Sequence, residues 1–86
     1  MNMKEMEINY NKYLIYSKKD EIKSWKNTIQ EYKINVAELV LSCAPQEEIN
    51  KYVKFIEKHK KDIEKLELEI ANLIVEIDKL KKEINN

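Results

Sequence analysis

The sequence predicts an all-α protein, a long antiparallel hairpin of two helices, from three observations. Isoleucine recurs every seven residues from Ile49 to Ile84. The chain of 86 residues contains no glycine, and 37% of its residues are charged. Its single proline, Pro45, divides it into two arms of nearly equal length. A charged, glycine-free sequence with helical periodicity is typical of long helices, and equal arms around a short break favour a hairpin.

The second arm, residues 45–84, is predicted to be a helix with a coiled-coil seam. Isoleucine occupies every first (a) position of its heptads, and the fourth (d) position is mostly leucine. Such spacing keeps the apolar side chains on one side of a helix. Pro45 suits a first helical position, and Glu47 and Glu48 follow where the helix dipole favours acids. The predicted self-association seam comprises Ile49, Ile56, Ile63, Leu66, Ile70, Leu73, Ile74, Ile77, Leu80 and Ile84.

The first arm, residues 4–42, is predicted to be a helix with a second seam. Apolar residues alternate at three and four positions from Ile22 to Leu39, and Ile8 and Ile15 extend the pattern towards the N-terminus. Two alternatives stay open for residues 4–16: a helix from Lys4, or an extended arm followed by a helix from residue 17. A break near residues 34–35 is a further alternative, because asparagine lowers helix propensity. The turn is predicted at residues 43–44.

Assembly of the chain is predicted from surplus apolar surface. In addition to the a and d positions, Leu68, Ala71, Ile74 and Val75 make the helix apolar on most sides around residues 66–77. A helix of this kind packs against more than one neighbour. We therefore expect the hairpin to pair with a second copy as a homodimeric four-helix bundle, with a different protein on that surface as the alternative. A kinked continuous rod competes with the hairpin, since no glycine is present to form the turn.

Residue types that carry chemistry are few, and we expect neither an enzyme nor a metal or cofactor site. A glycine-rich phosphate loop is excluded by composition. Cys43 has no local residue that would activate its thiol, and as a single cysteine it cannot form an intramolecular disulfide. His59 stands at a d position without a histidine or cysteine one turn away. We therefore interpret His59 as a polar residue that sets the register or lies at a solvated end of the seam.

The cellular location is predicted from features that the sequence lacks. It shows no basic segment followed by an apolar run at its start, and no apolar stretch long enough to span a membrane. A cytoplasmic protein without membrane contact is therefore expected.

Two surfaces are candidates for binding. Aromatic residues anchor many protein interfaces. The first candidate, for partner binding, combines a group of tyrosines near the N-terminus with two apolar residues of the second arm. These residues are Tyr10, Tyr13, Tyr16, Leu68 and Val75. A lysine stripe is the candidate for phosphates or an acidic partner, and its members are Lys51, Lys54, Lys58, Lys61 and Lys65.

The predicted function is that of a non-catalytic protein–protein interaction module, either a structural adaptor or a small inhibitor that blocks a larger protein. Small chains of this build are plausible products of phages or mobile elements. The alternative is a helical protein that binds nucleic acid through the lysine stripe. Its binding would be non-specific, because the chain contains no arginine to read bases, and salt-sensitive, because lysine–phosphate contacts release counterions.

Overall fold

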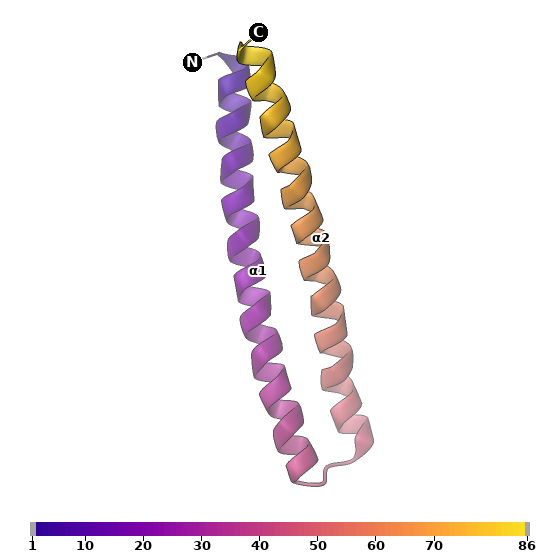
Figure 1. The fold of residues 1–86 in the computed structure, drawn as a ribbon. Coiled ribbons are helices and arrows are strands. Elements are labelled where there is room, and N and C mark those ends of the chain that lie inside the picture. The colour runs from indigo at the N-terminus through magenta and orange to yellow at the C-terminus, as the bar shows by residue number, and fades with distance from the viewer. Residues whose placement is uncertain (1, 86) are drawn as a thin grey trace.

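The structure, a computed structural model, describes residues 2–85 and is an antiparallel hairpin of two long helices. Helix α1 spans Met3–Leu41 and helix α2 spans Gln46–Asn85. The helices lie side by side, with both chain ends at one end of the molecule and the connection at the other (Figure 1). The molecule measures 65 × 15 × 13 Å. The all-α hairpin predicted from the sequence is confirmed, and the kinked rod is not the observed arrangement.

Helix α1 is continuous from its first residue to the turn. Asn2 caps it, because the side-chain Oδ1 accepts a hydrogen bond of 2.8 Å from the backbone N–H of Glu5. Residues 4–16 are helical, so the structure has the helix and not the extended arm. The helix also runs through Ile34 and Asn35 without a break.

The turn replaces the missing glycine with Cys43. The backbone N–H of Cys43 donates to the carbonyl of Val40 (3.1 Å), and that of Ala44 donates to the carbonyl of Leu39 (3.0 Å). This is the hydrogen-bond pattern of a Schellman motif, in which the residue after the helix adopts a left-handed conformation. Cys43 does so, with φ at 57°. Helix α2 then begins at Gln46, one residue later than predicted.

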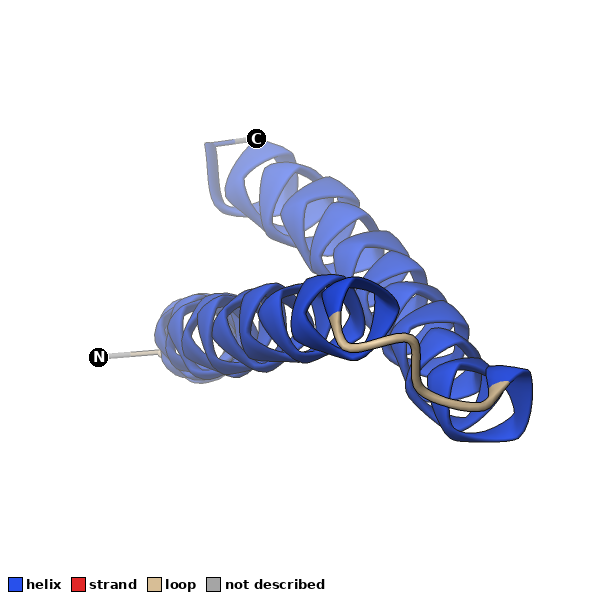
Figure 2. Cartoon of the chain, turned by 90° about the horizontal axis from the view of Figure 1, so that it is seen from below, coloured by secondary structure: helices blue, strands red, loops and turns tan. Residues whose placement is uncertain are grey.

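The core lies between the helices as two clusters. Near the turn, Ile22 and Ile29 of α1 pack with Ile56, Ile63 and Leu66 of α2. Near the chain ends, the cluster consists of Ile8, Ile15, Ile77 and Leu80, and the half-buried Ile70 packs against both clusters. Viewed from the turn, the two helix axes are inclined to each other, as seams of this kind require (Figure 2). Within residues 2–85, no helix is long and apolar enough to cross a membrane.

Candidate interaction surfaces

The heptad register divides the surface of the hairpin into two broad faces and two outer edges. The a and d positions of both helices point at each other, so the positions beside them border the seam. On the helix surface, position e flanks a and position g flanks d. In a pair of antiparallel helices, the e positions of both helices therefore lie on one broad face, and the g positions of both lie on the other. The hollows along the hairpin follow this division. Lys26 and Lys33 line one together with Lys60, whereas Glu21 lines another with Asp62.

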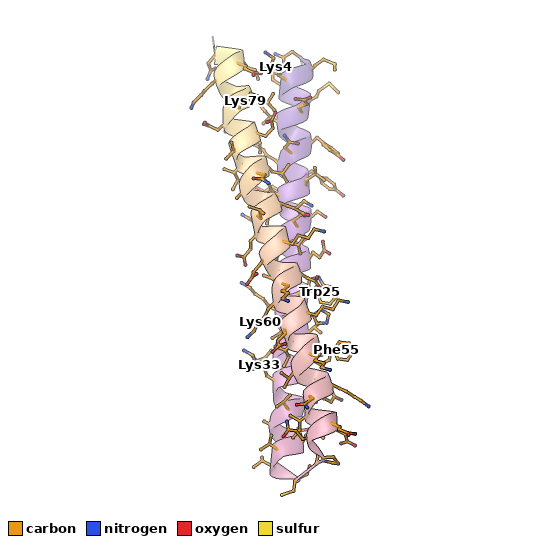
Figure 3. The ribbon with its side chains drawn as sticks, turned by 90° about the vertical axis from the view of Figure 1, so that its right-hand side faces the viewer. Lys4, Trp25, Lys33, Phe55, Lys60 and Lys79 are labelled. Atoms are coloured by element: carbon orange, nitrogen blue, oxygen red, sulfur yellow. The ribbon has the colours of Figure 1, made fainter. Side chains whose placement is uncertain are left out.

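One broad face is positively charged, and we call it the basic face. Its e positions hold six lysines and two glutamates: Lys12, Lys19, Lys26 and Lys33 in α1, Lys60 and Lys81 in α2, with Glu5 and Glu67. Lys33 and Lys60 project from the same side of the hairpin (Figure 3). The ion pairs between residues 2 and 85 use Lys4, Lys18 and Lys82, so the six lysines of the basic face keep their charges unpaired.

The opposite broad face is negatively charged, and we call it the acidic face. Its g positions hold seven acids and no lysine: Glu7 and Glu21 in α1, with Glu48, Asp62, Glu69, Glu76 and Glu83 in α2. Two of these acids pair with lysines at d positions of α1, Glu69 with Lys18 at 2.8 Å and Glu83 with Lys4 at 3.4 Å. The hydrogen bond from Lys18 lowers the pKa of Glu69 below its usual value. In a chain with no net charge, the e and g positions therefore separate charge across the width of the hairpin, although Lys18 and Lys65 also line the acidic side and Glu64 and Glu67 the basic side.

Aromatic side chains gather on the acidic side near the turn. Trp25 and Phe55 project away from the side that carries Lys33 and Lys60 (Figure 3). His59 is central to this group: its ring stacks on Trp25 with centroids 4.3 Å apart, and it lies near the rings of Tyr32 and Phe55. Only 8% of His59 is exposed. Its Nδ1 lies 3.4 Å from Oδ2 of Asp62. Of the two roles considered for His59, the structure fits a polar member of the seam and not a solvated end.

The predicted self-association seam packs against α1 of the same chain, with one exception. Ile56, Ile63, Leu66, Ile77 and Leu80 are buried, and Ile49, Ile70, Leu73 and Ile84 are half-buried. Ile74 is 54% exposed and lies at an e position on the basic face, where it lines a hollow with Lys12 and Lys19. Because folding of the hairpin already covers the other nine residues, their role in binding a second copy stays a prediction.

The predicted partner-binding residues are all exposed, but they lie on two different edges. Tyr10 and Tyr13 are on the outer edge of α1, opposite its seam, and Tyr16 lies beside them towards the basic face. Leu68 and Val75 are on the outer edge of α2. The structure therefore does not bring the two groups together.

Two methionines, which sequence analysis left out, complete the edge of α1. Met3, Met6, Tyr10 and Tyr13 follow one another at intervals of three, four and three residues, and between 57% and 79% of each is exposed. We call these four residues the aromatic edge. The signal that identifies them is their 3-4-3 spacing on the side opposite the isoleucines, at positions c and f.

The predicted lysine stripe, Lys51 to Lys65, is exposed along the outer side of α2 near the turn. It is separate from the basic face, which sequence analysis missed. Lysine recurs every seven residues from Lys12 to Lys33, and this repeat could have indicated a basic stripe on α1. That the stripe is part of a larger basic face follows only from the structure, in which α2 adds Lys60 to it.

No three potential metal ligands among histidine, cysteine, aspartate and glutamate gather within residues 2–85. Cys43 is exposed at the turn. Comparison of the chain with models of protein families, with curated proteins and with solved structures found no match.

Proposed function

We propose that this chain is a non-catalytic protein-binding module, an adaptor or small inhibitor, that binds a helix of its partner along the aromatic edge. The observation that carries this proposal is the exposure of Met3, Met6, Tyr10 and Tyr13 on a side of α1 that α2 does not cover. Their spacing is that of a helix seam, so a helix packed alongside α1 would cover all four. Tyrosine supplies much of the binding energy at protein interfaces, and methionine adapts to irregular partners.

Self-association of the chain belongs to the same proposal. An adaptor that assembles presents its aromatic edge more than once, which strengthens binding to a repeated partner without new contacts. The aromatic edge is an outer edge of the hairpin, so contacts between copies through a broad face leave it accessible.

The test begins with the full chain carrying a photo-crosslinking side chain at Tyr13, expressed in its own host, with the same group at Lys61 as the control position. A partner crosslinked at position 13 and not at 61 is then purified and titrated with the wild-type chain. We expect Tyr10→Ser together with Tyr13→Ser to weaken binding by about a hundredfold, as two interface tyrosines do. The matched variant with Leu68→Ser and Val75→Ser should bind normally. Equal binding by both variants would refute the role of the aromatic edge.

Phosphate binding is the second candidate, and the exposure of all five lysines of the stripe on one side of α2 favours it. It predicts retention on duplex DNA or RNA that falls steeply between about 0.05 M and 0.2 M salt. Lys54→Glu with Lys61→Glu should abolish that retention, whereas the tyrosine variant should keep it. Retention that survives the lysine changes would exclude the stripe as the binding surface.

A further inference from the structure

The two broad faces of the hairpin match each other in the spacing of their charges. On the basic face, Lys19, Lys26 and Lys33 follow at intervals of seven residues along α1. On the acidic face, Asp62, Glu69 and Glu76 follow at the same interval along α2. At 1.5 Å per residue, both series advance by about 10.5 Å per step. A single register can therefore bring several opposite charges together between two copies.

We propose that copies of this chain stack head to tail, with the basic face of one hairpin on the acidic face of the next. The occupant of each face is thus a second copy of this chain. This inference rests on the self-association included in the proposed function and assigns the surfaces that carry it. It does not depend on the aromatic edge.

One orientation of the second copy satisfies the charges best. A half turn about the axis perpendicular to the face places α2 of the second copy parallel to α1 of the first. In that register, the three lysines of α1 face the three acids of α2 in order. Lys60 of α2 lies between Leu14 and Glu21 of the neighbouring α1, about 6 Å along the axis from Glu21. One like-charged pair, Glu5 and Glu48, also meets. Copies stacked without the half turn place only Lys19 of the three lysines opposite an acid, Glu21, because Lys26 and Lys33 then meet the uncharged Thr28 and Asn35.

The same register also places Lys12 opposite Phe55. Phe55 is 49% exposed on the acidic face, and a lysine over an aromatic ring is a favourable contact. Asp62 and Glu69, although each already has a partner within its own chain, have side chains 40% and 36% exposed. Their carboxylates can therefore accept a second donor.

A symmetric pair that joins the same broad face of both copies is disfavoured by charge. Two basic faces would bring six lysines of each copy together, and two acidic faces would bring seven acids together, because a two-fold interface uses one surface twice. Like charges placed opposite each other oppose association. Contacts between unlike faces are free of this penalty and do not close on themselves, so the stack grows with concentration.

The test is sedimentation equilibrium of two charge-reversed variants, alone and mixed. One carries Lys33→Glu and Lys60→Glu on the basic face, and the other carries Glu21→Lys and Glu76→Lys on the acidic face. All four residues are exposed, and none takes part in an ion pair within residues 2–85. The control, Lys54→Glu with Lys61→Glu, changes the net charge as much as the first variant but on the outer side of α2. Circular dichroism checks that each variant is helical.

In about 0.02 M salt, we expect the wild-type chain and the control to associate increasingly with concentration. Each charge-reversed variant alone should associate with a dissociation constant at least about tenfold higher, since the facing pair Lys33–Glu76 and the nearby charges of Lys60 and Glu21 become repulsive. An equimolar mixture of the two should regain the wild-type constant, because the reversed charges again face their opposites. About 0.5 M salt should dissociate all of these assemblies.

Three results would overturn the proposal: a wild-type chain that is monomeric at low salt, a dimer that is insensitive to salt, or a mixture that does not regain association. Binding of a partner at the aromatic edge is measured separately with the tyrosine variant. Failure of the stacking therefore leaves the protein-binding proposal standing, and the reverse also holds.

Discussion

The rings of Trp25 and His59 stack across the hairpin, with centroids 4.3 Å apart and planes inclined by 20°. This contact joins the d positions of α1 and α2, and Trp25 packs against the core cluster near the turn. Tyr32 and Phe55 lie beside the His59 ring, and Tyr52 packs against Tyr32. An indole stacked on a buried imidazole contributes both apolar burial and a specific geometry, so the pair is a main determinant of the register between the helices.

Replacing Trp25 by alanine should lower the free energy of unfolding by about 3 kcal/mol, because truncation of a packed aromatic removes its contacts and leaves a cavity. Tyr13→Ala, on the exposed aromatic edge, is the control and should change stability by about 0.5 kcal/mol or less. Urea unfolding followed by circular dichroism measures both. Similar losses from the two variants would contradict the assignment of Trp25 to the core.

Replacing Cys43 by glycine should raise the free energy of unfolding by about 1 kcal/mol. Cys43 has a φ of 57°, which costs energy for any residue with a Cβ and none for glycine. Cys43→Ala keeps the Cβ and should leave stability almost unchanged, which separates the backbone effect from the loss of the thiol. A glycine variant no more stable than the alanine variant would argue against the left-handed conformation.

Acid should weaken the hairpin partly through Glu69. Its pKa is lowered in the folded state by Lys18, so its contribution to stability is present above the pKa of the unfolded carboxyl and is lost as the pH falls through the lowered folded value. Lys18→Met should raise the pKa of Glu69 in a carboxyl NMR titration. It should also reduce the loss of stability below about pH 4.5, the ordinary value for glutamate. An unchanged titration of Glu69 would show that the pair does not form in solution.

Replacing Asn11 by leucine should raise the free energy of unfolding by about 1 kcal/mol. Asn11 is half-buried at a d position of α1, between the isoleucines of the cluster near the chain ends. Leucine there would bury more apolar area and continue the seam. The same change at the exposed Asn27 is the control, and thermal unfolding compares the two. A destabilised Asn11→Leu variant would show that the asparagine is needed for the register.

The fold was predictable because one pattern spans the whole chain. The isoleucine repeat specifies the helices and their contact, and Pro45 fixes where they separate. The cap at Asn2 and the left-handed Cys43 were not predicted. The cap at Asn2 could be predicted only if the first residue of the helix were known. The left-handed conformation at Cys43 was missed because this position after a helix is usually occupied by glycine.

The candidate surfaces were only partly predictable. The exposure of Tyr10 and Tyr13 follows from their positions opposite the isoleucines. The basic and acidic faces, in contrast, each combine charges from both helices, so they emerge only when the antiparallel register is known. The same holds for the stacking of Trp25 on His59, whose residues are far apart in the chain.

The most direct test of the account is the distance between the two chain ends, because every surface described depends on the hairpin. Spin labels at Lys4 and Glu83, with Cys43 replaced by alanine and the labelled chain diluted in excess unlabelled chain, report this distance by pulsed EPR. The side chains of Lys4 and Glu83 are 3.4 Å apart at their closest atoms, so we expect a short distance of about 20 Å or less between the labels. A distance longer than the 65 Å length of the hairpin would contradict the fold and every surface derived from it.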